Sequence, residues 1–293
     1  MYDNIKLAVI GGDRRLSAAA EAAAADGFEC AVWGNSICYG GVVRCTSPED
    51  ALRGASVVIL PLPLSQDGVR LFAPDSIEGG DLRLTKLVEA IPQNAKVYGG
   101  KIPCDIMCML RGREISFKDY YEEEAFKIKN AYQTAEGAIG IAIKELPVTL
   151  FGSRALVVGY GRVGRATAEL LKKMGVKVTV AARRESDLAD AICRGMNIYN
   201  DSSGLEGISS EYDCIFNTVP VRLFTDKVLH SLSGTLFVEL ASSPFGADAS
   251  SAEAAGVKMI RAISLPGKTC PVSAGVSIYE TVVSNMKKEG VII

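Results

Sequence analysis

The sequence predicts an α/β protein built from two doubly wound parallel-sheet domains with a cleft between them. Apolar runs alternate with helical segments twice along the 293-residue chain, and this alternation is typical of a parallel sheet that helices cover on both faces. Near the middle of the chain, residues 155–166 (ALVVGYGRVGRA) pass from an apolar run through three glycines into a helical pattern. That order is typical of a sheet that binds a nucleotide at a strand-to-helix turn.

The first half begins with a predicted strand, residues 5–12, that ends in two glycines. An alanine-rich helix follows, and Gly27 closes it as a C-terminal cap. Later apolar runs predict further strands, and one run between them predicts a helix. The strands are expected at residues 28–34, 55–64 and 95–102, and the helix at 84–92.

A long segment joins the two halves. Residues 117–146 contain no breaker except Gly137 and Gly140, which predicts one or two long helices from about Phe117 onward. Residues 147–152 are expected to turn into the second sheet.

The second half repeats the scheme of the first. Its strands are expected at 154–159, 176–183, 212–220, 235–242 and 257–262, with a helix at 162–175. A final helical stretch, 270–290, follows the completed sheet, and such a helix often packs back across a domain boundary. We therefore expect a first domain of residues 1–130, with a returning helix in 270–293, and a second domain of residues 131–269.

Composition excludes several classes of protein. A net charge of −2 and a pI near 5.7 give no basic surface for nucleic acid, and no apolar run reaches the ~20 residues that cross a membrane. One histidine, His230, and eight scattered cysteines show no metal-ligand spacing, so we expect no metal and reduced cysteines. The apolar run near the start is short and ends in glycine, which favours a strand over a secretory leader. These features predict a cytoplasmic protein that acts on small molecules.

The central glycines have the spacing of a dinucleotide fingerprint in a Rossmann-like domain. Gly159 allows a tight turn, Gly161 lets a pyrophosphate approach the backbone, and Gly164 lets the helix pack closely on the strand. The helix that begins with Arg162 and Val163 offers unpaired N–H groups and a positive dipole end to the phosphates. The alternative is a glycine turn with a structural role only.

The end of the next strand is expected to select the cofactor. NAD-binding proteins place an acidic residue there to hold the ribose hydroxyl, whereas this chain has Arg183 and Arg184. Two guanidinium groups suit a 2′-phosphate by charge and by geometry, so NADP is favoured over NAD. Glu185, which follows them, leaves open the alternative of a solvated basic turn.

Two later loops are expected to line the ribose and nicotinamide, because ligands of open parallel sheets bind beyond the carboxyl ends of the strands. One loop is formed by Asn217, Thr218, Val219 and Pro220, and the other contains Ser242. Each loop is also compatible with an ordinary turn.

The first half contains a candidate anion site. Arg14 and Arg15 follow Asp13 at the start of the first helix, where cations are normally disfavoured. We interpret the three residues as a substrate-binding group for a carboxylate, and a surface pair of arginines is the alternative.

Two residues of the second domain are candidates for catalysis. Lys268 lies in an expected loop before the final helix, where it would meet a substrate carboxylate, although a tight connecting turn is equally compatible. Glu136 lies in an otherwise apolar helical run and is a candidate desolvated acid–base group; an ordinary ion-pair partner is the alternative.

These motifs together resemble the A subunit of dipicolinate synthase, an enzyme of spore-forming bacteria. The resemblance rests on VIGGDRR (9–15), TAEGAI (134–139), VVGYGRVG (157–164), NTVP (217–220) and LPGKTCPVSAG (265–275), which occur in that order along nearly the whole chain. The glycine motif is shared with many dehydrogenases. VIGGDRR, TAEGAI and LPGKTCPVSAG are the motifs that distinguish this family from other dehydrogenases.

The resemblance implies an NADP-dependent oxidation of a dihydrodipicolinate-type precursor from the lysine pathway to pyridine-2,6-dicarboxylate. It also implies an oligomer with the flavoprotein-like B subunit of dipicolinate synthase, in the mother cell during sporulation. The second domain is similar to the cofactor domains of 2-hydroxyacid and alanine dehydrogenases, but no histidine occupies a comparable loop, which argues against simple 2-hydroxyacid chemistry. A dicarboxylate substrate needs cationic partners, for which Arg14, Arg15 and Lys268 are the candidates.

Two other functions stay open from the sequence. One is another NADP-dependent dehydrogenase of a small carboxylic acid, similar to shikimate or methylenetetrahydrofolate dehydrogenase, for which a lysine such as Lys101 would be positioned for catalysis. The other is a non-catalytic nucleotide-binding protein that supports a partner.

Overall fold

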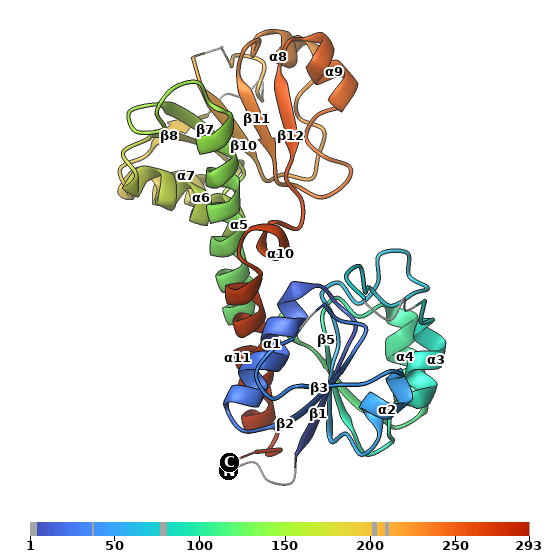
Figure 1. The fold of residues 1–293 in the computed structure, drawn as a ribbon. Coiled ribbons are helices and arrows are strands. Elements are labelled where there is room, and N and C mark those ends of the chain that lie inside the picture. The colour runs from blue at the N-terminus through green and yellow to red at the C-terminus, as the bar shows by residue number, and fades with distance from the viewer. Residues whose placement is uncertain (1–4, 37, 77–80, 201–203, 209–210, 293) are drawn as a thin grey trace. The chain divides into compact units, whose positions relative to one another are not determined.

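The structure, a computed structural model, describes residues 5–36, 38–76, 81–200, 204–208 and 211–292 (Figure 1). The chain forms two compact units, one of Met1–Asn130 with Cys270–Ile293 and one of Ala131–Thr269. Among the described residues, no helix is both long enough and apolar enough to cross a membrane.

The first unit is a six-stranded sheet in the order β3-β2-β1-β4-β5-β6, and every neighbouring pair is parallel. Its strands are β1 (Lys6–Ile10), β2 (Glu29–Trp33), β3 (Val43–Arg44), β4 (Val57–Ile59), β5 (Lys96–Gly99) and β6 (Ser116–Asp119). Its helices are α1 (Arg14–Ala25), α2 (Pro48–Leu52), α3 (Leu84–Ala90), α4 (Cys104–Gly112), the 3₁₀ helix η1 (Tyr120–Glu122) and α11 (Pro271–Lys288).

Helices cover both faces of this sheet. Leu16 of α1 and Ile278 of α11 pack into one apolar cluster, and Leu87 of α3 and Ile106 of α4 pack into another. Figure 1 accordingly shows α1 beside α11 on one side of the strands, with α2, α3 and α4 on the other. Burial on both faces explains why β1 and β4 read as continuous apolar runs.

The second unit repeats this topology in the order β12-β11-β10-β7-β8-β9, again with parallel neighbours. Its strands are β7 (Arg154–Val158), β8 (Lys177–Ala181), β9 (Asn197–Tyr199), β10 (Cys214–Asn217), β11 (Leu236–Glu239) and β12 (Lys258–Arg261). Its helices are α6 (Arg162–Lys173), α7 (Glu185–Cys193), α8 (Asp226–His230), α9 (Ala249–Ala254) and α10 (Leu265–Thr269), and α5 (Glu124–Glu145) runs into it from the first unit.

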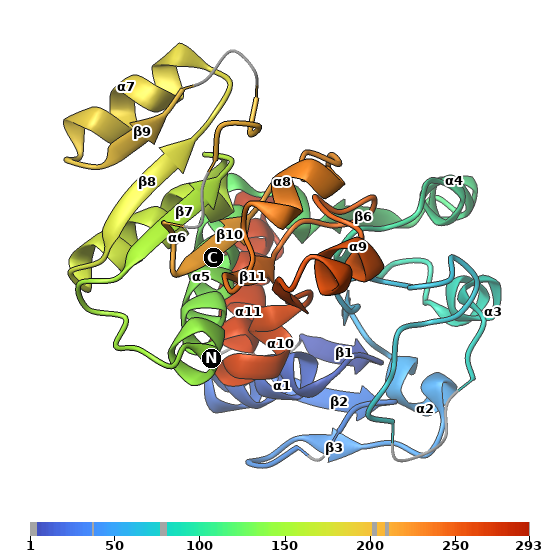
Figure 2. The ribbon, with the colours of Figure 1, turned by 90° about the horizontal axis from the view of Figure 1, so that it is seen from above.

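The layers of the second unit also enclose the sheet. Ala142 of α5, Leu171 of α6 and Leu265 of α10 share one apolar cluster, whereas Leu229 of α8 and Ala252 of α9 share another. Figure 2 shows α8 and α9 next to each other and close to β11. Both units therefore have the strand order of a nucleotide-binding α/β sheet, with a switch point between the first and fourth strands. The predicted class, an α/β protein with two doubly wound parallel-sheet domains, is confirmed.

Two expectations about local structure are wrong. Phe117 lies in β6, paired with Val97 of β5, rather than in a helix; the short run Ser-Phe-Lys-Asp is locally indistinguishable from the polar helical segment that follows it, because its pairing partner is distant in sequence. The segment around Lys268 is not a loop but the short helix α10, in which the Thr269 hydroxyl donates a hydrogen bond to the Leu265 carbonyl (2.9 Å).

Two glycines of the discriminating motifs allow helices to pack closely within a unit. A Cβ at Gly137 of α5 would lie 2.8 Å from Thr269 Oγ1, and a Cβ at Gly275 of α11 would lie 2.2 Å from the Arg15 carbonyl oxygen. Both distances are too short for real side-chain carbons. Close packing between helices therefore accounts for part of both motifs.

Candidate functional site

The glycine-rich turn of the second unit connects β7 to α6. Gly159 has a φ of 92°, a backbone conformation that favours glycine, and its N–H donates to the Ala181 carbonyl (2.8 Å). Gly161 is the N-cap of α6, and within the described part of the chain no side chain caps this helix end. Within the described residues, the turn therefore leaves the start of α6 without a side-chain cap, an arrangement that favours anion binding by backbone N–H groups.

The other two glycines of the turn have different surroundings. A Cβ at Gly164 would lie 2.1 Å from the Gly159 carbonyl oxygen, so α6 meets the β7 turn at van der Waals distance. A Cβ at Gly161 would meet no described atom within 4 Å, and Gly161 is exposed. The absence of a side chain at Gly161 thus leaves open space beside the helix end, which fits the approach of a pyrophosphate to the backbone.

Arg183 and Arg184 follow β8, at the same edge of the sheet as the glycine turn. Both are exposed, but they differ in their contacts. The Arg184 guanidinium binds the carboxylate of Asp187 through Nε (2.8 Å) and Nη2 (3.0 Å), and this pairing raises the pKa of Arg184. Arg183 has no hydrogen bond or ion pair with any residue that the structure describes, so its charge is available to an anion.

The loops after β10 and β11 are joined by a buried carboxylate that the sequence analysis missed. Glu239, the last residue of β11, is fully buried and accepts hydrogen bonds from Asn217 Nδ2 (2.7 Å), the Ala241 N–H (3.0 Å) and the Gly246 N–H (2.7 Å). A Cβ at Gly246 would lie 2.2 Å from Asn217 Nδ2. The signal in the sequence is a lone acidic residue at the end of an apolar strand, in TLFVELAS.

The Glu239 network fixes the loops that were expected to line the cofactor. Asn217 is fully buried, and its Nδ2 also donates to the Val219 carbonyl (3.1 Å). The Thr218 hydroxyl donates to the Val158 carbonyl (2.9 Å) and lies beneath Gly159. Pro220 and Ser242 are exposed. The structure thus gives Asn217 and Thr218 internal partners, while Pro220 and Ser242 face solvent beyond the strand ends.

Glu239→Gln is expected to destabilise the second unit by about 1–3 kcal/mol, because the new amide nitrogen faces an N–H or NH₂ group at a site built for an acceptor. Burial raises the pKa of Glu239, and the hydrogen bonds that it accepts limit the rise. A carboxyl whose folded-state pKa is raised favours the folded protein below its unfolded-state pKa, and this contribution falls as the pH rises. The difference in free energy of unfolding between the natural chain and the variant should therefore become smaller as pH rises above the ordinary glutamate pKa. Urea unfolding of both proteins between pH 4 and 8 measures this difference, and a difference that grows with pH would contradict this account.

The corresponding turn of the first unit is closed by its own chain. The Gly12 N–H donates to the Phe72 carbonyl (2.7 Å), and the Leu71 side chain lies against Gly11, 2.5 Å from the position of a Cβ there. Residues of the segment after β4 therefore pack directly against the Gly11–Gly12 turn. This unit has the strand order of a nucleotide-binding sheet, but unlike Gly161 in the second unit, its glycine turn is covered by its own chain.

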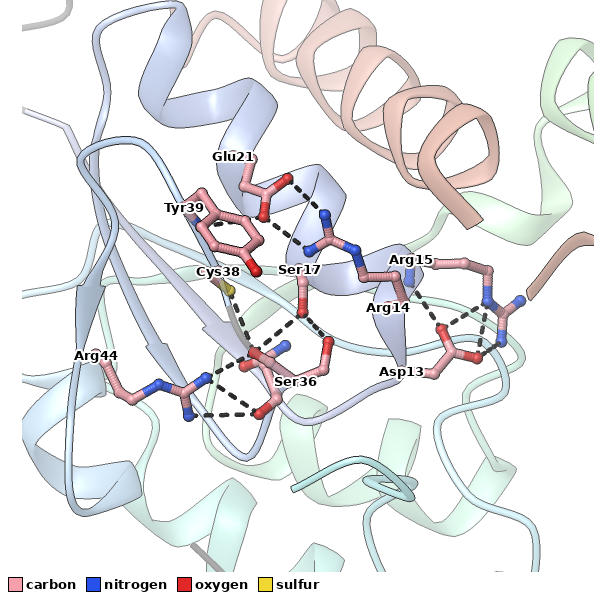
Figure 3. A network of polar contacts seen from close by, with 10 residues as sticks. Asp13, Arg14, Arg15, Ser17, Glu21, Ser36, Cys38, Tyr39 and Arg44 are labelled. Atoms are coloured by element: carbon pink, nitrogen blue, oxygen red, sulfur yellow. Dashed lines mark hydrogen bonds and ion pairs between the residues drawn. The ribbon is translucent and has the colours of Figure 1, made fainter. Parts of the chain in front are cut away.

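The same turn holds a buried guanidinium. Arg15 is 6% exposed; its Nε and Nη2 donate to the carboxylate of Asp13 (2.9 and 2.8 Å), and Nη2 also donates to the Leu62 carbonyl (2.6 Å). Asp13 is also the N-cap of α1 and accepts the Arg15 N–H (3.0 Å). Figure 3 shows this carboxylate facing one edge of the guanidinium. Arg15 is thus oriented by a carboxylate and a carbonyl.

Arg14 points into a different set of contacts. Its two terminal nitrogens donate to the two carboxylate oxygens of Glu21 (2.8 and 3.2 Å), and Glu21 also accepts the Tyr39 N–H (3.1 Å). The guanidinium lies 5.8 Å from the Tyr39 ring centroid (Figure 3). Arg14 therefore contributes to fixing the segment after β2, and the two adjacent arginines have separate environments.

The candidate catalytic residues of the second unit are exposed. Glu136 lies on an exposed face of α5, so the desolvated environment expected for its carboxylate is not found. Lys268 is exposed on α10. His230 is exposed on α8, with Nδ1 2.7 Å from the Asp226 carbonyl oxygen. The part of the chain that the structure describes contains no cluster of three potential metal ligands.

Comparison with family models covers both units. Residues 6–121 match the model of the N-terminal domain of the dipicolinate synthase A subunit. Residues 127–233 match the D-isomer specific 2-hydroxyacid dehydrogenase, NAD binding domain. The second match contains the glycine turn, the arginines after β8 and the loop after β10.

Comparison with whole proteins covers nearly the entire chain. The chain is 28% identical to the dipicolinate synthase A subunit of Bacillus subtilis (strain 168) over 297 residues, which cover 99% of this chain and 98% of that protein. The crystal structure of the dipicolinate synthase A subunit from Bacillus halodurans matches with a TM-score of 0.85 and 26% identity, over 97% and 98% of the two chains. A transhydrogenase from Sinorhizobium meliloti matches with a TM-score of 0.69 and 14% identity, over 93% and 88% of the chains. The last match shows the fold alone, and the first two confirm the resemblance to the dipicolinate synthase A subunit.

Proposed function

We propose that this chain is the NADP-dependent component of a dipicolinate synthase and oxidises a dihydrodipicolinate-type precursor to pyridine-2,6-dicarboxylate. The observation that carries the proposal is the β7–α6 turn, in which Gly161 leaves open space beside an uncapped helix end. The match of this unit to an NAD-binding domain supports a nicotinamide dinucleotide. Arg183, which is exposed and unpaired within the described chain, favours the 2′-phosphorylated form.

The chain's own residues would mainly bind and orient. When bound, a nicotinamide dinucleotide would supply the hydride acceptor for a ring carbon of the substrate, and the proton lost from the neighbouring atom as the ring becomes aromatic would pass to solvent or to an acid–base group such as Glu136. Because aromatisation provides driving force, positioning and charge complementarity are the protein's main tasks. The Glu239 network would fix the loops of Asn217 and Ser242 in place for this purpose.

The substrate carboxylates need cationic partners. Arg15 is oriented by Asp13 and Leu62, which favours it as a carboxylate-binding residue, whereas the contact of Arg14 with Glu21 supports a role in positioning the segment after β2. Glu136 and Lys268 are both exposed. Glu136 is the candidate acid–base group, and Lys268 is a further candidate for binding a substrate carboxylate.

We expect the activity to need a flavoprotein-like B subunit, because the Bacillus subtilis relative is named as one subunit of its enzyme. Each purified protein, and the mixture, should be incubated with the precursor and with NADP or NAD while the absorbance of dipicolinate is followed. The mixture with NADP should give the fastest formation. Full synthesis by this chain alone, unchanged by adding the B subunit, would contradict the need for a partner. Formation that is independent of this chain would favour a non-catalytic role.

A further inference from the structure

Lys101 has an unfavourable backbone conformation at the carboxyl end of β5. Its φ is 53°, in the left-handed region that side-chain-bearing residues rarely adopt. The conformation is held by Asp119, whose carboxylate accepts the Lys101 N–H (3.1 Å) and the Ile102 N–H (2.9 Å). Residues held in such conformations occur preferentially at functional sites, and glycine would adopt the same φ without strain.

The Lys101 side chain has no carboxylate partner among the residues that the structure describes. It is exposed, and its ammonium lies 4.8 Å from the centroid of the Tyr121 ring. Lys127 lies 5.9 Å from the same ring, but it is paired with Glu122 (2.7 Å). The positive charge of Lys101 is therefore not neutralised by an ion pair within the described chain.

Arg15 and Gly100, the residue before Lys101, are both hydrogen-bonded to one short turn, residues 61–64. Arg15 Nη2 donates to the Leu62 carbonyl (2.6 Å). The Gly100 N–H donates to the Pro61 carbonyl (3.1 Å), and the Leu64 N–H donates to the Gly100 carbonyl (2.8 Å). A Cβ at Gly100 would lie 2.7 Å from the Leu62 Cβ. The turn thus fixes the backbone before Lys101 relative to the Arg15 guanidinium.

Arg15 has one terminal nitrogen left for a ligand. Asp13 and Leu62 engage Nε and Nη2, and Nη1 has no acceptor within the described residues. Arg15 as a whole is only 6% exposed, but its Nη1 atom is accessible to solvent. A buried guanidinium that presents one donor group to solvent is suited to bind a carboxylate end-on.

We propose that Arg15 and Lys101 bind the two carboxylates of one small, planar diacid at the carboxyl end of the first unit's sheet. Arg15 Nη1 donates to one carboxylate, and the Lys101 ammonium, on its flexible stem, meets the other. This inference rests on the proposed function, which supplies the diacid, and it assigns the second carboxylate to Lys101 rather than to Lys268. A glycine would adopt this left-handed conformation without strain. The presence of lysine at position 101 is therefore explained by a need for its side chain in binding the diacid.

The test compares a diacid with a monoacid. Pyridine-2,6-dicarboxylate and pyridine-2-carboxylate are titrated into the full chain by calorimetry. No cofactor is added, because Arg15 and Lys101 both belong to the first unit and the proposed cofactor site belongs to the second. The natural chain should prefer the diacid. Lys101→Met should weaken diacid binding by about 10- to 100-fold, as loss of a charged hydrogen bond predicts, and leave the monoacid unchanged. Lys86→Met, which removes an exposed lysine of α3, is the charge-matched control and should change neither.

Three outcomes would overturn the inference. If Lys101→Met still prefers the diacid, Lys101 does not bind the second carboxylate. If the preference is lost in Lys268→Met alone, the second carboxylate is bound by Lys268 of α10. Failure of the natural chain to bind either acid overturns the proposed function, and the inference with it.

A second variant separates the side chain from the backbone. Lys101→Gly should raise the melting temperature, because glycine adopts a φ of 53° without strain, and it should lose diacid preference as Lys101→Met does. A Lys101→Gly chain that is more stable and still prefers the diacid would show that the ammonium has no part in binding.

Discussion

Gly164→Ala is expected to destabilise the second unit by about 3 kcal/mol or more and to abolish binding of the cofactor. The new methyl group would lie 2.1 Å from the carbonyl oxygen and 2.8 Å from the carbonyl carbon of Gly159. Both are backbone atoms of a turn fixed by the hydrogen bond from Gly159 N–H to Ala181, so α6 must move away from β7. Overpacking of this kind costs at least about 1–3 kcal/mol, and the displaced helix end no longer directs its N–H groups at the phosphates.

Gly161→Ala is the matched control for this substitution. Its methyl group would meet no described atom within 4 Å, so the loss of stability, measured by thermal unfolding, should be limited to about 1 kcal/mol, the cost of alanine in place of glycine at an N-cap. Cofactor affinity, measured by fluorescence titration with NADPH, should still fall, because the methyl group occupies the space where the pyrophosphate approaches. If the two variants lose stability equally, or if Gly161→Ala binds NADPH normally, the separate roles assigned to these glycines are wrong.

The features predicted well from the sequence are those set by local chemistry. The order of a strand, three spaced glycines and a helix predicts the β7–α6 turn, because the need for glycine arises within the turn itself. Gly159 has a positive φ, and Gly164 lies too close to the Gly159 carbonyl to carry a side chain. The apolar runs of β1 and β7 are similarly informative, since a strand buried on both faces needs apolar residues at every position. Two such alternations are sufficient to predict both sheets.

The features that sequence analysis missed depend on partners far away in the chain. Glu239 binds Asn217, 22 positions earlier, and the conformation of Lys101 depends on Asp119, 18 positions later. Asp13, Arg14 and Arg15 read as one cluster in the sequence, but Glu21 and Leu62 give the two arginines separate environments. The helix expected at Phe117 is wrong because β6 is defined by pairing with β5, which no local pattern reveals.

Replacing Arg183 and Arg184 together by alanine is expected to weaken NADPH binding on the order of 100-fold while changing NADH binding less than about twofold. A charged hydrogen bond to a phosphate contributes about 1.5–3 kcal/mol, and both side chains are exposed, so solvent reduces the combined loss to about 3 kcal/mol. The two residues should not contribute equally. Arg184 already shares its guanidinium with Asp187, whereas Arg183 has no ion-pair partner in the described chain, so Arg183→Ala alone should cause the larger loss.

The control must remove the same charge without touching the cofactor edge of the sheet. Arg154 and Lys177 are exposed and begin β7 and β8 at their amino ends, so the double variant Arg154→Ala with Lys177→Ala lowers the net charge equally at the opposite edge. Titrations at two salt concentrations then separate a direct contact from a general field, because the general field is screened more strongly by salt. The assignment requires that only the Arg183/Arg184 pair discriminates NADPH from NADH. Equal losses for the two cofactors, or an equal effect of the control pair, would leave the 2′-phosphate without the partners proposed for it.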